Sequence, residues 1–182
     1  MNLAQTNIEV IPATAEQAPI LANLLELYCY DFSELIDLKI DALGRFGYAQ
    51  LPLYWTEANR FPFLIQVDGH WAGFALVCKG SQLSGDKTIW DMAEFFILRG
   101  YRRSGIGRQA AHQVWEKCPG SWEVRVLTQN PSAKDFWHRA ISEFIGQTIE
   151  SRDFAKGEKR WQVFSFDSQD HACPIRKAQP FN

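Results

Sequence analysis

The alternation of apolar and polar residues predicts a strand and two helices at the start of the chain. Residues 8–12, IEVIP, are a short β-prone run that ends at a proline. In residues 13–30, apolar side chains recur at the spacing of an amphipathic helix, and a proline near its start is expected to delay regular hydrogen bonding. The pattern then predicts a short helix over residues 32–38, followed by an irregular connection rich in glycine and aromatic residues.

A hairpin is the clearest signal in the middle of the chain. Residues 61–67 and 70–79 are two β-prone runs, and Asp68 with Gly69 between them favours a tight turn. Residues 88–98 form a nearly continuous apolar run, as expected for a central strand that is covered on both faces. This region therefore predicts a largely antiparallel start to a sheet.

The remaining elements alternate between helix and strand. They are a helix over residues 106–117, a strand over 122–128, a helix over 132–141 and two strands over 144–150 and 159–167 around a charged turn. The resulting order predicts a mixed α/β fold, with a mostly antiparallel central sheet of about seven strands and helices on both faces. Residues 1–167 are expected to form a single domain, and the polar residues 168–182 a tail that is poorly ordered or docks on a partner subunit.

The composition is that of a soluble globular protein and narrows the classes of partner. Hydrophobic residues make up 46% of the chain and charged residues 22%, and the formal net charge is −2. With a pI near 6.1, the chain has no general attraction for nucleic acid or for anionic membranes. It has no apolar run near the ~18 residues of a membrane span and no signal-peptide pattern, so a cytoplasmic location is expected.

Neither the cysteines nor the histidines are spaced as metal ligands. The four cysteines are widely scattered and include no C-x-x-C pair, which is typical of small apolar residues in a reducing compartment. The four histidines are equally dispersed. No metal site and no disulfide framework are therefore expected.

The most informative segment is RRSGIGR, which lies between the apolar run and the helix predicted to follow it. A helix that begins directly after a glycine-bearing loop leaves its first backbone N–H groups unpaired, and phosphate oxygens satisfy such donors. Gly105 and Gly107 would let the backbone approach a phosphate closely, and nearby arginines would add positive charge. The candidate residues for this diphosphate site are Arg102, Arg103, Ser104, Gly105, Ile106, Gly107 and Arg108. An ordinary glycine-rich turn with solvated arginines and a loop for a different nucleotide are the alternatives.

The motifs RRSGIGR, residues 102–108, and NPSAKDFW, residues 130–137, together resemble the GNAT superfamily of acyl-CoA-dependent N-acyltransferases. Arg102, Gly105 and Gly107 match the family's pyrophosphate loop. Residues 130–137, NPSAKDFW, are similar to a second block, which in that family follows the fifth strand and opens a helix against the pantetheine arm. The resemblance implies a GNAT-like fold, in which strands four and five part and hold the pantetheine between them, and it implies acetyl-CoA as the co-substrate.

The resemblance also points to residues along the coenzyme arm and around the oxyanion. The positions that match the second block are Asn130, Ala133, Phe136 and Trp137. In the family, a backbone N–H at the end of the fourth strand binds the oxyanion, which implies Phe96, Ile97 and Leu98. Asn130 is equally suited to cap the following helix, and the apolar side chains to plain core packing.

Glu94 is the candidate general base. It is the one ionisable residue in the apolar run 92–98, where burial would raise the pKa of a carboxyl group. Carboxylates on this strand serve as base in some members of the family that the chain resembles. The alternative is a carboxylate that only makes hydrogen bonds at a strand edge.

The general acid is less clearly marked. The family's usual acid is a tyrosine, but Trp137 holds that position, and an indole N–H does not protonate a thiolate. Tyr101 is the candidate in its place. The other tyrosines of the chain, which remain open for this role, are Tyr28, Tyr30, Tyr48 and Tyr54. A further alternative is a thiolate that leaves without help from the protein.

The resulting hypothesis is an N-acetyltransferase that moves an acetyl group from acetyl-CoA to a primary amine of a small molecule or protein, by direct attack in a ternary complex. Acidic residues interleaved with aromatics over residues 26–37 would attract a cationic amine, although a solvated helix face has the same pattern. The alternative function, suggested by Trp137, is a catalytically weak acyl-CoA-binding sensor or partner-binding module. A monomer or homodimer is expected, with no nucleic-acid or membrane partner.

Overall fold

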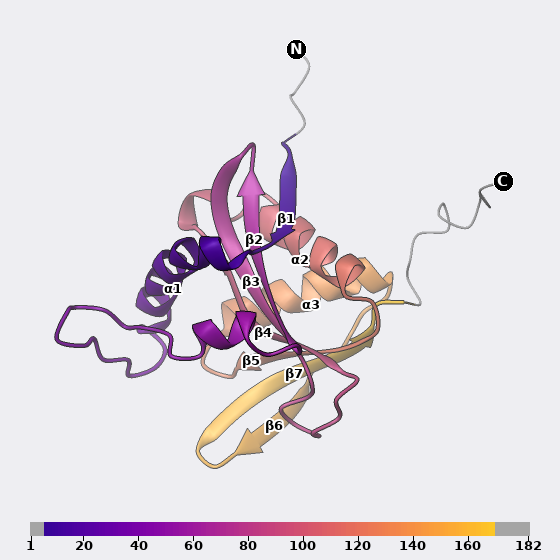
Figure 1. The fold of residues 1–182 in the computed structure, drawn as a ribbon. Helices are drawn as coiled ribbons and strands as arrows, with labels where there is room; N and C mark the ends of the chain where they lie inside the picture. The colour runs from indigo at the N-terminus through magenta and orange to yellow at the C-terminus, as the bar shows by residue number, and fades with distance from the viewer. Residues whose placement is uncertain (1–5, 170–182) are drawn as a thin grey trace.

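A seven-stranded sheet forms the centre of the computed structural model, which describes residues 6–169 (Figure 1). The strands are β1 (Ile8–Pro12), β2 (Arg60–Val67), β3 (His70–Lys79), β4 (Trp90–Ile97), β5 (Ser121–Leu127), β6 (Arg152–Lys156) and β7 (Lys159–Asp167). They lie in the order β1, β2, β3, β4, β5, β7, β6, and all neighbours are antiparallel except β4 and β5. The predicted mixed, mostly antiparallel sheet is confirmed.

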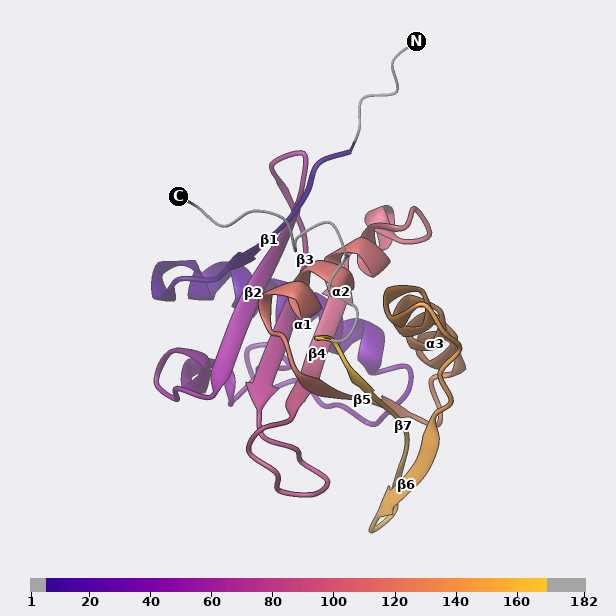
Figure 2. The same ribbon diagram turned by 90° about the vertical axis from the view of Figure 1, so that its right-hand side faces the viewer.

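Helices cover both faces of the sheet (Figure 2). On one face, α1 (Ala18–Phe32) buries Leu21, Leu24 and Leu25 in what we call the α1-side cluster. On the other, α2 (Ile106–Lys117) and α3 (Pro131–Ile145) bury their apolar stripes in the α2/α3-side cluster. Full burial of a leucine contributes on the order of 2 kcal/mol, so these stripes hold each helix on its face. Within residues 6–169, no helix has the length and apolar character needed to cross a membrane.

The predicted hairpin and first helix are confirmed. Asp68 and Gly69 both have positive φ, 49° and 78°, the geometry of a tight turn that matches the twist of β2 and β3. The first helix begins at Ala18, with Pro19 in its first turn, where a missing N–H costs nothing.

The predicted helix over residues 32–38 is wrong. The first helix continues to Phe32, and the chain then turns and runs irregularly until a short 3-10 helix, Leu51–Trp55. Most residues of this irregular segment are exposed or half-buried, so no apolar face is available to stabilise a separate helix.

The predicted strand over residues 144–150 is also wrong. The third helix continues to Ile145, whose side chain is buried one turn after Ile141, and it ends where Gly146 adopts φ of 70°. Helical packing therefore overrides the β-prone composition. The sixth strand lies instead inside the expected charged turn, because an exposed edge strand needs no apolar pattern.

Little of the predicted C-terminal tail is described by the structure. Its first residue, Ser168, is buried and makes hydrogen bonds with the backbone of Gly120. Residues 170–182 lie outside the described residues.

The two central strands β4 and β5 separate soon after they meet. In the described part of the chain they pair at two positions, Trp90 with Trp122 and Asp91 with Glu123. A bulge in β4 follows, since Leu76 of β3 pairs with Glu94 while the next residue, Val77, pairs with Met92. The bulge turns Glu94 toward the α1-side cluster, at the point where the strand leaves its parallel neighbour.

Candidate functional site

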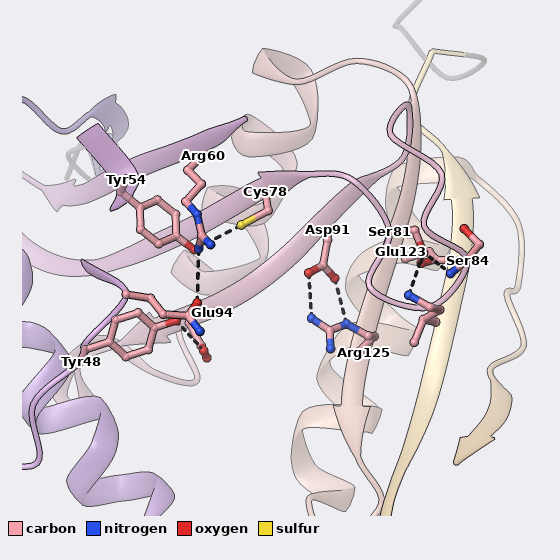
Figure 3. Close-up of polar contacts among 12 residues, drawn as sticks. Tyr48, Tyr54, Arg60, Cys78, Ser81, Ser84, Asp91, Glu94, Glu123 and Arg125 are labelled. Carbon is pink, nitrogen blue, oxygen red and sulfur yellow. Dashed lines mark hydrogen bonds and ion pairs between the residues drawn. The ribbon is translucent and has the colours of Figure 1, made fainter. Parts of the chain in front are cut away.

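Glu94 lies at the centre of a small polar cluster on the α1 side of the sheet. The hydroxyl of Tyr28, from α1, donates to Glu94 Oε2 at 2.5 Å. The hydroxyl of Tyr48, from the irregular segment after α1, donates to Glu94 Oε1 at 3.0 Å. Figure 3 shows Tyr48 directed at the carboxylate. Both carboxylate oxygens are therefore held in place by hydroxyl donors.

Burial and hydrogen bonding shift the pKa values of all three side chains in this cluster. Burial raises the pKa of Glu94, and the hydrogen bonds from Tyr28 and Tyr48 offset that rise only in part. Burial and the charge of Glu94 raise the pKa values of both tyrosines, so their hydroxyls stay protonated. The carboxylate is thus poised to take up a proton at a higher pH than an ordinary glutamate.

The tyrosine that the sequence singled out lies elsewhere. Tyr101 is in a 3-10 turn (Arg99–Tyr101), and its ring packs against the α2/α3-side cluster, whereas Glu94 faces the α1-side cluster. Tyr30 is 65% exposed. The hydroxyl of Tyr54 contacts the Cys78 sulfur at 3.4 Å. The structure brings Tyr28 and Tyr48, rather than Tyr101, to the carboxylate.

The glycine-bearing loop offers a run of unpaired backbone donors. Gly105 stands just before α2 with φ of 84°, and Arg103 also has a positive φ, 64°. Among the described residues, the backbone N–H groups of residues 103–108 make no hydrogen bond, and the first to do so is that of Gln109, which donates to the Gly105 carbonyl. A helix N-terminus of this kind is suited to bind an anion.

The arginines of the loop are less free than the sequence suggested. Arg102 Nε donates to the Ile97 carbonyl at 2.6 Å, and its Nη2 donates to Asp31 Oδ2 at 2.5 Å. Arg99 binds the other oxygen of Asp31, and Arg108 pairs with Glu143 on α3. In the described part of the chain, Arg103 makes no ion pair.

Asp31 does not present an unpaired acidic charge. Partial burial opposes its ionisation, but hydrogen bonds from Arg102 and Arg99 hold its pKa below the ordinary value. The predicted attraction of a cationic amine to this part of α1 is therefore largely cancelled by the two guanidinium groups.

The end of β4 directs one backbone N–H, that of Ile97, into the space where the strands part. Leu98 N donates to the Ala72 carbonyl at 2.8 Å, so this amide is already bound by β3. Bonded and non-bonded pairs alternate along antiparallel strands, so the N–H and carbonyl of Ile97 point away from β3, toward β5. Of the predicted oxyanion donors, Ile97 is the one whose amide direction fits. Phe96 and Leu98 pack their side chains on the α1 side.

The second motif meets the loop from α3. Asn130 caps this helix, since its Oδ1 accepts the Ala133 N–H at 3.0 Å. Trp137 is buried, with its ring centroid 5.1 Å from that of Phe95 on β4. Phe136 stacks on the same Phe95.

A contact at Gly107 shows how closely the two motifs approach. A Cβ at this position would lie 3.4 Å from both Ile97 and Phe136. The end of β4, the loop and the start of α3 therefore converge at Gly107, with Ala133 and Phe136 half-buried at the edge.

A buried ion pair joins β4 to β5 where they part (Figure 3). Arg125 donates to both oxygens of Asp91, at 3.0 and 2.7 Å, and Asp91 is 1% exposed. Glu123, also buried, accepts hydrogen bonds from Ser81 and Arg152. This bidentate contact fixes the point from which the two strands diverge.

The sequence reasoning did not identify the partners of Glu94. Tyr28 follows Leu21 and Leu24 at helical spacing, so the sequence could have predicted that it lies on the face of α1 that packs on the sheet. Tyr48 lies in an irregular segment, and no spacing rule relates it to a strand. Among residues 6–169, no group of three or more His, Cys, Asp or Glu side chains is arranged to hold a metal ion.

Comparison with known proteins agrees with this geometry. A family model described as the acetyltransferase (GNAT) family matches residues 24–141. A search of curated proteins finds no match for the chain. Among solved structures, an acetyltransferase from Thermus thermophilus is similar at 19% identity and a TM-score of 0.67, over 88% of this chain and 97% of that one.

Two further solved structures have the same fold and are described with bound ligands. One is a putative acetyltransferase, yncA, from Salmonella typhimurium with its cofactor acetyl-CoA, at 14% identity and a TM-score of 0.59, over 92% of this chain and 98% of that one. The other is Arabidopsis thaliana NAA60 in complex with a bisubstrate analogue, at 13% identity and a TM-score of 0.57, over 88% and 98%.

Proposed function

Because the chain belongs to the GNAT acetyltransferase family, we propose that it transfers an acetyl group from acetyl-CoA to a primary amine of a small molecule or protein, by direct attack in a ternary complex. The observation that carries this proposal is the position of Glu94. Its carboxylate has a raised pKa, is held by Tyr28 and Tyr48, and lies on the strand whose end directs the Ile97 N–H toward β5.

The residues present fit the diphosphate of the co-substrate. The amides of residues 103–108, which make no hydrogen bond within residues 6–169, would supply the donors, and Gly105 provides the left-handed turn that aims them. Arg103, exposed and without an ion pair among the described residues, supplies positive charge. Asn130, Ala133, Phe136 and Trp137 would line the arm from the α3 side, the last mainly by packing.

Acyl transfer requires that Glu94 accept one proton. As the amine nitrogen bonds to the acetyl carbon and the bond from that carbon to sulfur breaks, the nitrogen loses a proton, which the carboxylate of Glu94 takes up directly or through water. The Ile97 N–H, which points away from β3, stabilises the negative charge that develops on the acetyl oxygen.

The departing thiolate has little need of a protein acid. A thiol has a pKa of about 8.5, so the thiolate is a tolerable leaving group near neutral pH. Tyr101 remains the candidate donor from the sequence, and Trp137 packs in the core beside Phe95. The phenols of Tyr28 and Tyr48 are already engaged in holding Glu94.

Thiol release tests the proposed function directly. The protein is mixed with acetyl-CoA and a panel of amines that includes diamines, amino sugars and peptides with free N-termini, and free thiol is followed by a colorimetric reagent. Amine-dependent release is the expected result. Tight binding of acetyl-CoA without release on any amine would instead favour the acyl-CoA-binding module as the function.

Replacing Gly105 by Ala tests the loop. The added Cβ has room, 3.6 Å from the Arg108 side chain, but the left-handed φ costs about 1–2 kcal/mol for alanine. We expect lower stability and a higher KM for acetyl-CoA, measured by urea unfolding and steady-state kinetics. Gly85→Ala, at an open position with φ of 78°, is the matched control. Equal KM values for the two variants would contradict a coenzyme role for the loop.

A further inference from the structure

We propose that Glu26 is a positioning residue, which holds the segment that carries Tyr48 so that the Tyr48 hydroxyl stays on Glu94. The proposal rests on the function of Glu94 given above. Glu26 lies on α1, one turn before Tyr30 and on the edge of the helix that meets the irregular segment.

The contact between Glu26 and that segment is specific. Glu26 Oε2 accepts the Phe46 N–H at 2.8 Å, and Glu26 Oε1 accepts the Gly47 N–H, also at 2.8 Å. The next residue is Tyr48, whose hydroxyl donates to Glu94 Oε1. Hydrogen bonds to an ionised carboxylate are roughly twice as strong as neutral ones, so one side chain on α1 fixes the backbone immediately before Tyr48.

Nothing comparable holds the rest of the segment. Within the described chain, the two bonds to Glu26 are the hydrogen bonds that join residues 37–47 to the body of the protein. Asp41 closes its own turn by accepting from Leu43 and Arg45. Ile40 and Leu43 are 58% and 75% exposed, so apolar burial adds little there. Loss of the Glu26 contact should therefore release the segment.

The two tyrosines that donate to Glu94 are held in place by different contacts. Tyr28 projects from the middle of α1 and packs edge-on against Phe74 and Phe96, so it needs no help from Glu26. Tyr48 follows Gly47, whose φ of 68° turns the chain, and lies outside every helix and strand of the described chain. Its carbonyl accepts the Leu51 N–H at 3.0 Å and its side chain packs on the α1-side cluster, so on its N-terminal side the contact with Glu26 is what holds it. Removing Glu26 is expected to disturb Tyr48 and to leave Tyr28 in place.

A kinetic cycle tests this dependence. Glu26→Ala and Tyr48→Phe are each expected to lower kcat by about tenfold while the KM for acetyl-CoA stays within about twofold. The double variant should be no slower than Tyr48→Phe alone, because both changes remove the same hydroxyl from Glu94. In the double variant of Glu26→Ala with Tyr28→Phe, the two decreases in kcat should multiply, because the two changes affect different hydroxyls. Glu116→Gln, which removes an exposed carboxylate on α2, is the control.

Absorbance titration of tyrosine gives a readout that needs no turnover. Burial and Glu94 raise the pKa of Tyr48, so it should stay protonated at about pH 11 in the wild type, a pH above the ordinary phenol pKa. Glu26→Ala should show about one more tyrosinate at that pH, and the double variant with Tyr48→Phe should not. If Glu26→Ala folds poorly, the same titration can be made with Glu26→Gln, which keeps the side-chain length but has only one acceptor oxygen.

The outcomes separate this proposal from the proposed function. No extra tyrosinate in either Glu26 variant, or kinetic effects of Glu26 and Tyr48 that multiply, would overturn the role of Glu26. If the wild type releases no thiol on any amine, the proposed function fails, while the titration still decides whether Glu26 holds Tyr48.

Discussion

Replacing Glu94 by Gln is expected to lower kcat/KM for amine acetylation by about 100-fold near pH 7, because the amide cannot take the proton that the amine loses. Burial raises the pKa of Glu94, so the wild-type rate should fall as the pH drops through that raised pKa and the carboxylate becomes protonated. The variant should lose this acid limb and recover in part at higher pH, where more of the amine is already neutral. The measurement is kcat/KM against pH for both proteins.

Stability measurements separate a catalytic effect of Glu94→Gln from a folding defect. A raised pKa in the folded state means that the folded protein binds this proton more tightly than the unfolded chain, so ionised Glu94 lowers stability above that pKa. The variant should therefore unfold at the same temperature as the wild type, or a higher one, at about pH 8. Glu116→Gln, at an exposed position on α2, is the control. An unchanged pH profile would remove Glu94 from the mechanism.

Gly73→Ala is expected to lower the free energy of unfolding by about 3 kcal/mol or more, the upper end of the cost of overpacking. A Cβ at Gly73 would lie 2.0 Å from the Phe96 carbonyl oxygen and 3.1 Å from the Ile97 Cα. Both contacts are with backbone, which cannot yield unless β3 separates from the end of β4. The substitution should therefore also weaken acetyl-CoA binding, because the Ile97 amide would shift. Urea unfolding and titration calorimetry measure the two effects.

Gly100→Ala is the control for Gly73→Ala. Gly100 lies just beyond the same strand, has no atom within 4 Å of an added Cβ, and does not have a positive φ. Its replacement should change stability by no more than about 0.5 kcal/mol. Wild-type stability in Gly73→Ala would show that the two strands do not approach as closely as described.

Most of the elements and the positions of the two motifs between them were predictable because their signals are local. The spacing of apolar residues along a strand or helix predicts which of its faces is buried, and Asp68 followed by Gly69 predicts a tight turn. Glu94 stood out as a lone charge in an apolar run, and its raised pKa follows from that placement. One of the failures also has a local cause. The edge strand β6 carries mostly polar side chains, so its sequence resembles a turn.

What the sequence alone determined is therefore the fold class, the position of the glycine-bearing loop and the charged residue on the central strand, since each of these signals lies within short stretches of the chain. The tertiary structure decided which side chains surround that residue and which arginines are free. Tyr28 and Tyr48 reach Glu94 from 66 and 46 residues away, and Asp31 binds Arg102 from 71 residues away. Such contacts depend on how α1 and the irregular segment pack on the sheet, and the spacing of residues along the chain does not predict that packing.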